Sequence, residues 1–252
     1  MLLPFIAMNP ILIAAAVIPA IVLFIMVYRL DKLEKESPRL LFALIIYGIF
    51  ATGLASLTEE AGTFLLGRIF TEGSAAYEIL MYFVVVALTE EGFKYLLLKR
   101  RTWNEIEFNC RFDGIVYAVS VSIGFALWEN IGYVVRYGFR TALARAVTAV
   151  PGHVCFAVFM GVFYGLARHK YVNGRFRSSA VYRKSALLIP TLLHGTYDFL
   201  ATRDSALYSW FFVGFVAVMF AVSLAVLLIS SKHDRYLDSV TQDGVNYRVI
   251  DL

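Results

Sequence analysis

The stretch Leu88-Thr89-Glu90-Glu91-Gly92-Phe93-Lys94 places two adjacent carboxylates and an ammonium inside an otherwise apolar run from Tyr77 to Leu98. About 20 apolar residues, each rising about 1.5 Å, cover a hydrocarbon core of roughly 30 Å, so the run is long enough to cross a bilayer as a helix. Each charge near the centre of such a helix costs roughly 2.5 to 3.5 kcal/mol on insertion. The stretch therefore predicts a transmembrane helix whose charges are paired, neutralised or directed into a wet cavity.

Helical spacing offers one partner to both carboxylates. Lys94 follows Glu90 by four residues and Glu91 by three, so its ammonium can reach either one. A simple ion pair would serve only to fix helix packing. One ammonium cannot neutralise two carboxylates, however, and a poised carboxylate is what a general base requires. Because the two glutamates lie about 100° apart on the helix, we expect one to face a nucleophile and the other to meet Lys94.

The composition is that of a membrane protein. Hydrophobic residues make up 60% of the 252 residues and charged residues 17%, whereas soluble domains are roughly 45 to 50% apolar. The chain is therefore predicted to be an all-α polytopic transmembrane helical bundle of about seven spans with an enclosed polar site, covering residues 1–231, with a polar cytoplasmic tail at 232–252. The expected spans are 10–28, 40–58, 77–98, 113–135, 146–167, 185–201 and 208–230. The net charge of +4 comes from loops and indicates no nucleic-acid partner.

Local signals add further expectations. Residues 59–74 contain acidic and glycine residues around a short apolar piece, which predicts a surface loop or a loop with a half-helix. Asp113 is expected to be the N-cap of the fourth span. Cys110 and Cys155 would lie at different membrane depths, so no disulfide is expected. No Lys or Arg precedes the first apolar run, which favours a first transmembrane helix over a removed signal peptide.

Basic residues predict the orientation. Of the 23 Lys and Arg residues, 17 fall in connections on one side of the expected membrane and five on the other, while Lys94 lies within a span. Cytoplasmic loops keep the positive charge. The carboxyl terminus is therefore expected in the cytoplasm and the amino terminus outside.

Further ionisable side chains lie within the expected spans: Glu129, His153, His194 and Asp198. Imidazole and carboxylate groups are ligands that zinc accepts, and a catalytic zinc site keeps three protein ligands and one position for water. A nearby glutamate can then take the proton of that water. His153 and His194 are the expected nitrogen ligands. The third ligand is either Glu129 or Asp198, unless Asp198 instead orients an imidazole.

Two glycines on the fifth span, Gly161 and Gly165, form a small-xxx-small pair. Small residues at this spacing let another helix approach closely. We therefore expect a tight helix contact at this point of the bundle.

The order and combination of these motifs resemble the PrsW family of bacterial intramembrane proteases, relatives of the CAAX prenyl proteases. The resemblance covers about residues 75–201 and rests on five motifs: Glu90-Glu91-x-x-Lys94, Asp113-x-x-x-Tyr117, Gly124-Phe125-Ala-x-x-Glu129-Asn130, His153 with Gly161 and Gly165, and His194-x-x-x-Asp198.

The resemblance implies a multi-pass metalloprotease of the bacterial plasma membrane, surrounded by lipid. Its substrate would be a single-pass membrane protein such as an anti-sigma factor, in which it makes the first cut. Glu90, Glu91 and Glu129 would be catalytic, and His153, His194 and Asp198 would bind Zn²⁺. The related CAAX enzymes leave a second mechanism open, in which a glutamate and histidines activate water without a resident metal.

Two other functions use the same residues. A proton- or ion-coupled transporter could use them as a relay, although transporters usually show repeated halves and interrupted helices, and neither pattern is visible in this sequence. A membrane scaffold could use them as packing contacts, but seven ionisable groups on four helices exceed what packing requires. The sequence therefore favours the protease.

Overall fold

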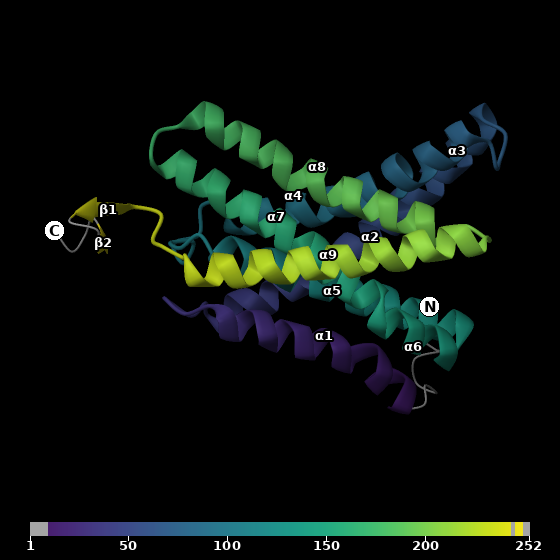
Figure 1. The fold of residues 1–252 in the computed structure, drawn as a ribbon, viewed down its shortest axis with the longest axis horizontal. Helices are drawn as coiled ribbons and strands as arrows, with labels where there is room; N and C mark the ends of the chain where they lie inside the picture. Colours follow the sequence, from purple (N-terminus) through teal and green to yellow (C-terminus); the bar gives the residue numbers. More distant parts are fainter. Residues whose placement is uncertain (1–9, 243–244, 249–252) are drawn as a thin grey trace.

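The computed structural model describes residues 10–242 and 245–248, which form a bundle of long helices followed by a β-hairpin (Figure 1). Six long helices are α1 (Pro10–Leu30), α2 (Pro38–Ile69), α5 (Asp113–Tyr137), α7 (Ala149–Val172), α8 (Phe176–Ala201) and α9 (Ala206–Lys232). A seventh column runs without interruption through α3 (Ala75–Leu80), η2 (Met81–Leu88) and α4 (Thr89–Thr102). The short helix α6 (Phe139–Val147) precedes α7, and β1 (Ser239–Gln242) pairs antiparallel with β2 (Val245–Arg248).

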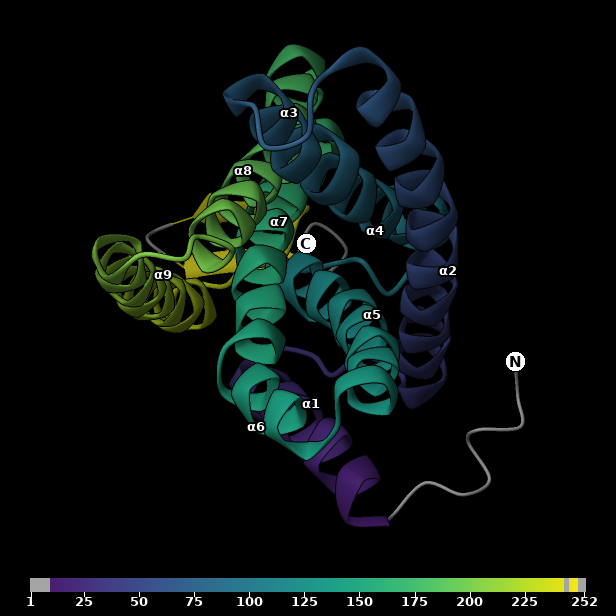
Figure 2. The same cartoon turned by 90° about the vertical axis from the view of Figure 1, so that its right-hand side faces the viewer.

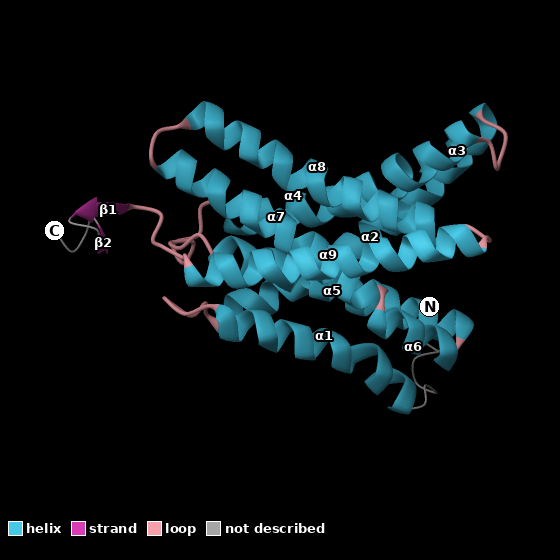
Figure 3. Ribbon diagram, in the orientation of Figure 1, coloured by secondary structure: helices cyan, strands magenta, loops and turns pink. Residues whose placement is uncertain are grey.

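Four segments of the described chain are long and apolar enough to cross a membrane: α2, α5, the end of α6 joined to α7, and α9. The column that contains α4 carries Glu90, Glu91 and Lys94, as the sequence predicts. The predicted helical membrane bundle is confirmed. Helices make up nearly all of it, and most of its connections lie near its two ends (Figure 3).

We call the two ends of the bundle the hairpin end and the opposite end. The hairpin end holds connections 31–37, 103–112 and 173–175 and the segment 233–238 that leads to the hairpin, whereas the opposite end holds connections 70–74 and 202–205 (Figure 1). At the hairpin end, Cys110 forms an isolated β-bridge with Tyr236. Both Cys110 and Cys155 are free and buried.

Helix α5 occupies the middle of the bundle, between α2 and α7 and beside α1 and α4 (Figure 2). Glycines make this possible. A Cβ on Gly161 would lie 2.4 Å from the Cα of Ile115, and one on Gly165 would lie 2.2 Å from the carbonyl oxygen of Arg111. The close helix approach predicted for this glycine pair is therefore confirmed. It brings α7 against α5, and with it His153.

The prediction of a surface loop at residues 59–74 is wrong. Helix α2 continues to Ile69, and only Phe70 to Ser74 form the turn. Glu, Ala and Leu are good helix formers, so the two adjacent glutamates do not interrupt the helix. Gly62 lies within the helix and lets η2 approach, since a Cβ at that position would lie 2.9 Å from Val85.

The prediction that Asp113 caps its own helix is also wrong. Phe112 precedes the helix, and Asp113 is its first residue. Its Oδ2 accepts hydrogen bonds from the backbone N–H groups of Cys110 at 2.6 Å and Asn109 at 2.9 Å. The carboxylate therefore turns back over the preceding connection. Most other span boundaries differ by a few residues, but α8 starts at Phe176 rather than 185 because its polar first turns extend beyond the apolar run.

Candidate active site

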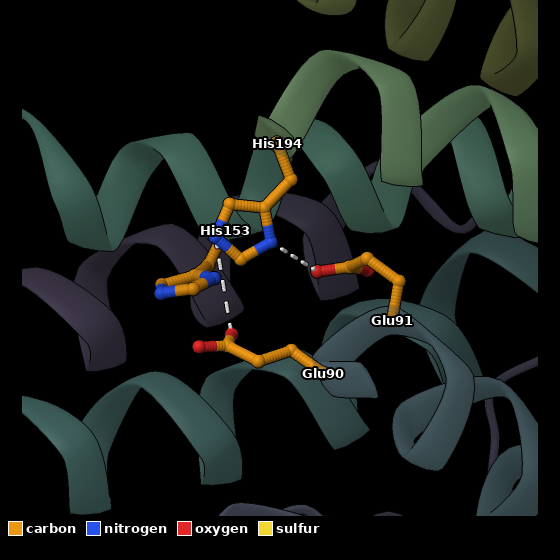
Figure 4. Close-up of side chains that lie close together, drawn as sticks. All are labelled: Glu90, Glu91, His153 and His194. Atoms are coloured by element: carbon orange, nitrogen blue, oxygen red, sulfur yellow. Dashed lines mark hydrogen bonds and ion pairs between the residues drawn. The ribbon is translucent and has the colours of Figure 1, made fainter. Parts of the chain in front are cut away.

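Three helices bring four predicted site residues together. Glu90 and Glu91 come from α4, His153 from α7 and His194 from α8 (Figure 4). All four are buried, and one ligand atom of each lies within 4.8 Å of the others. Four polar groups that converge in this way, from positions up to 104 residues apart, form an enclosed polar site inside the bundle. We call these four residues the EEHH cluster.

Lys94 lies inside the EEHH cluster. Its Nζ is 2.7 Å from Glu91 Oε1, 3.2 Å from Glu90 Oε2 and 3.3 Å from His153 Nδ1. The ammonium also lies 3.8 Å from the centre of the Phe125 ring, a cation–π contact. The expectation that only one glutamate meets Lys94 is therefore wrong. Because Lys94 is four residues from Glu90 and three from Glu91, its ammonium lies between the two carboxylates and contacts both.

Each imidazole has its Nδ1 directed into the EEHH cluster and its Nε2 close to an outer carboxylate, and His194 Nε2 also lies 3.9 Å from Glu90 Oε2. His194 Nδ1 lies 3.0 Å from Glu91 Oε1, while its Nε2 lies 3.3 Å from Asp198 Oδ2. His153 Nδ1 faces Lys94, while its Nε2 lies 2.8 Å from Glu129 Oε2. The outer carboxylates fix the orientation of both rings.

Packing further restrains the two histidines. The ring of Phe156 stacks on His194 with a centroid separation of 4.8 Å and an interplanar angle of 20°. Ser122 on α5 donates a hydrogen bond to the backbone carbonyl oxygen of His153 at 2.9 Å. The rings therefore have little freedom to leave the site.

Glu129 and Asp198 form an outer layer rather than part of the EEHH cluster. Their side chains are 19% and 23% exposed. Glu129 Oε2 also lies 2.8 Å from Arg145 Nη2. The sequence left the third metal ligand open between Glu129 and Asp198. The structure groups the histidines with Glu90 and Glu91 instead.

Sequence reasoning missed two charged residues beside the site. Glu59 on α2 interacts electrostatically with Glu129, His194 and Lys94, and its Oε1 is buried without a hydrogen-bond partner. Arg145 on α6 pairs with Glu129. Glu59 was assigned to the mispredicted loop, and uninterrupted helix propensity from 38 onward was the signal that could have found it. Nothing in the sequence indicated that Arg145 turns inward.

The site lies in the half of the bundle near the opposite end. His153 is four residues from the start of α7 and His194 is seven from the end of α8. At about 1.5 Å per residue, these positions are about 6 and 10 Å from the helix ends. The site is therefore closer to the opposite end than to the hairpin end.

The chemistry of the donors suits a metal ion. Two imidazoles and two carboxylates are groups that zinc accepts. Lys94 already contacts three of these four residues, so a cation bound there would compete with the ammonium. The residues fit a metal once this side chain moves aside.

Comparisons with known proteins show the family of this chain. A family model described as PrsW family intramembrane metalloprotease matches residues 36–227. The chain is 33% identical to Protease PrsW of Geobacillus kaustophilus over 75% of its own length and 79% of the relative's. It is 32% identical to Protease PrsW of Halalkalibacterium halodurans, over 89% and 99% of the two lengths. The corresponding values for Protease PrsW of Bacillus subtilis are 29%, 80% and 86%. No solved structure matches the chain.

Proposed function

Since this chain belongs to the PrsW family of intramembrane metalloproteases and is a membrane peptidase, we propose that it hydrolyses a peptide bond of a single-pass membrane protein at the EEHH cluster. The observation that carries the proposal is the convergence of Glu90, Glu91, His153 and His194 in one buried site. An anti-sigma factor is the proposed substrate type. Hydrolysis needs water held between a base and an acid, and this site supplies both kinds of group.

The metal of the proposed reaction is Zn²⁺, which His153 and His194 of the EEHH cluster would hold. When bound, it would lower the pKa of a water molecule and polarise the substrate carbonyl. Every other task falls to the protein. His153 and His194 present their Nδ1 atoms to the cluster, and Glu129 and Asp198 lie beside their Nε2 atoms.

We assign the general base to Glu90. Glu91 has two close partners, Lys94 at 2.7 Å and His194 at 3.0 Å, whereas the contacts of Glu90 are longer, at 3.2 and 3.9 Å. The freer carboxylate can accept a proton from water and pass it to the amide nitrogen that leaves. Glu91 keeps Lys94 and His194 in position.

The proposed orientation puts the hairpin end in the cytoplasm and the opposite end outside. The 17 basic residues that the sequence assigns to one side of the membrane belong to the helix ends, connections and tail at the hairpin end. Cytoplasmic segments keep the positive charge. The site would then lie in the outer half of the membrane, which agrees with a first cut near the outer surface of the substrate.

The test uses purified protein and a single-pass substrate in liposomes, with mass spectrometry of the products. We expect one cut in the part of the substrate that lies in the outer half of the membrane. A cut at the cytoplasmic boundary would contradict the orientation, and no cut of any tested single-pass protein would contradict the proposed substrate class.

A further inference from the structure

A second group of buried carboxylates lies at the hairpin end of the bundle, away from the EEHH cluster. It consists of Asp31, Glu36 and Asp113, which are 1%, 3% and 0% exposed. One oxygen of each lies within 4.8 Å of the others. Asp31 follows α1, Glu36 precedes α2 and Asp113 begins α5, so the group joins three parts of the chain. We call it the acidic triad.

The carboxylates of the acidic triad have few partners. Glu36 accepts a hydrogen bond from the Tyr117 hydroxyl, and Asp113 Oδ2 accepts the two backbone N–H groups described above. Both oxygens of Asp31, and Oδ1 of Asp113, are buried and have no hydrogen-bond partner. Asp31 is thus a fully buried carboxylate, and it points into a group of other carboxylates.

No basic side chain in the described ranges forms an ion pair with the acidic triad. Burial raises the pKa of the Asp31 carboxyl and the Lys35 ammonium acts to lower it, but the Lys35 Nζ donates to the backbone carbonyl oxygens of Tyr28 and Asp31 and not to a carboxylate oxygen. A buried carboxylate without a partner is costly, so it needs either a proton or a cation.

The donors of the acidic triad are all oxygen atoms. Hard cations such as Ca²⁺ and Mg²⁺ prefer carboxylate oxygens, at about 2.3 to 2.6 Å for Ca²⁺ and about 2.0 to 2.1 Å for Mg²⁺. Two oxygens on opposite sides of one Ca²⁺ ion can therefore be about 5 Å apart, a separation that includes the 4.8 Å limit seen here. Zinc would favour nitrogen and sulfur donors, which the triad does not contain.

We propose that Asp31, Glu36 and Asp113 form a binding site for a hard divalent cation, Ca²⁺ or Mg²⁺, that links the α1–α2 connection to the start of α5. The site is separate from the EEHH cluster. Asp113 and Glu129 lie on the same helix 16 residues apart, which corresponds to about 24 Å. The inference does not depend on the proposed proteolytic function.

Neighbouring contacts show what the cation would hold together. Glu107, in the α4–α5 connection, accepts hydrogen bonds from the Ser37 backbone N–H and hydroxyl, both at 2.8 Å. Asp234, after α9, accepts the backbone N–H of Phe112 at 2.9 Å. These contacts place the start of α2, the α4–α5 connection and the end of α9 beside the triad. The cation would stabilise the packing of these segments at the hairpin end of the bundle.

The alternative state of the acidic triad holds protons in place of the cation. Burial raises the pKa of Glu36 to about 8 and the pKa of Asp31 to about 6. Protonated carboxyls could therefore occupy the same positions near neutral pH. The experiment must separate this state from cation binding.

The test is calorimetric titration of the full-length protein in detergent, after chelator treatment and dialysis, with CaCl₂ in one arm and MgCl₂ in the other. We expect saturable binding of at least one ion, accompanied by a higher melting temperature. Asp31→Asn should lower the affinity by at least about tenfold, because the charge of the ligands sets the affinity of oxygen sites. Glu34→Gln is the matched control, since this glutamate lies in the same connection but is exposed, and it should bind as wild type does.

Glu36→Gln is the second variant, should Asp31→Asn fail to fold. The proposal is overturned if neither ion binds more than KCl at equal ionic strength, which would leave the protonated state. It is also overturned if both variants bind like wild type, or if Glu90→Gln abolishes the binding, because the ion would then sit elsewhere.

Discussion

The EEHH cluster and the acidic triad are both buried and rich in carboxylates, but their charges are balanced differently. In the EEHH cluster, Lys94 contacts both glutamates and the two imidazoles supply further partners. In the acidic triad, no described lysine or arginine plays this part, and Asp31 has no hydrogen-bond donor on either oxygen. A buried carboxylate group therefore does not by itself indicate one function, because the cations around it decide what it can do.

The difference has a consequence for metal binding. A metal at the EEHH cluster must displace the Lys94 ammonium, whereas a cation at the acidic triad would neutralise carboxylates that have no ion-pair partner in the described residues. The first arrangement suits a reactive centre whose groups must change partners during turnover. The second suits a permanent structural ion.

The largest expected effect separates the two clusters by activity. Glu90→Gln removes the proposed base and should lower the cleavage rate by at least about 10² to 10⁴-fold, the range that general bases contribute. The melting temperature should stay close to wild type. Cleavage of the single-pass substrate measures the rate. Glu60→Gln, an exposed neighbour of Glu59 on α2, is the matched control and should cleave normally.

Glu91→Gln should also lower the rate, but through the positions of Lys94 and His194. Full activity in both glutamine variants would show that neither glutamate of α4 is the general base. Full activity in Glu90→Gln, together with loss of activity in Glu91→Gln, would assign the general base to Glu91 and the positioning role to Glu90.

The next effect compares the two lysines. Lys94→Met leaves two buried carboxylates without their cation and should lower the free energy of unfolding by about 3 to 5 kcal/mol. Lys35→Met removes hydrogen bonds to backbone carbonyl oxygens and an exposed cation–π contact with Tyr28, but no ion pair with a carboxylate, and should change it by about 1 kcal/mol. Denaturant titration in detergent, with chelator present, measures both. Equal effects would mean that Lys94 does not balance the EEHH cluster.

A smaller effect is expected in the outer layer of the active site. Asp198→Asn and Glu129→Gln keep the shape of the side chain but weaken its hold on the imidazole. Each should lower activity by about 10 to 100-fold, as typical for partners of metal-bound histidines. The metal content should change less than in a histidine variant. If Asp198→Asn abolished metal binding outright, the aspartate would be a direct ligand.

The smallest effect concerns the acidic triad without its cation. Asp31→Asn removes a buried charge, so in chelator the variant should be more stable than wild type by about 1 kcal/mol. Adding the divalent cation should reverse the order, because only wild type binds it tightly. Melting curves in both buffers test this. A variant less stable than wild type in chelator would show that the Asp31 carboxylate does not destabilise the protein when the cation is absent.

The sequence was sufficient for most of the fold. Apolar runs predicted the long helices, and the Gly161 and Gly165 spacing predicted the tight contact of α7 with α5. The α2 boundary was mispredicted, because two glutamates and two glycines look like a loop, whereas the helix formers around them continue the helix to Ile69 and Gly62 lies against Val85 of η2. In physical terms, composition sets which segments enter the membrane, but contacts between helices set where each helix ends.

The candidate site was predicted as a set of residues and not as an arrangement. Paired charges and histidines in apolar runs stand out because each is costly there. Which of them touch depends on how helices far apart in the chain pack, so spacing could not choose between Glu129 and Asp198. The acidic triad gave no signal, because Asp31 and Glu36 look like solvated loop residues in a charged stretch.

The EEHH cluster is proposed to hold a catalytic metal, and metal analysis of the active protein is the decisive test of that proposal. The protein should be purified without chelator or polyhistidine tag, and its metal content measured on the sample used for cleavage. We predict bound zinc that is lost together with cleavage in His153→Ala and His194→Ala. Cleavage that proceeds without bound zinc or another transition metal, and that resists a membrane-permeant chelator, would contradict the claim and assign water activation to glutamate and histidine alone.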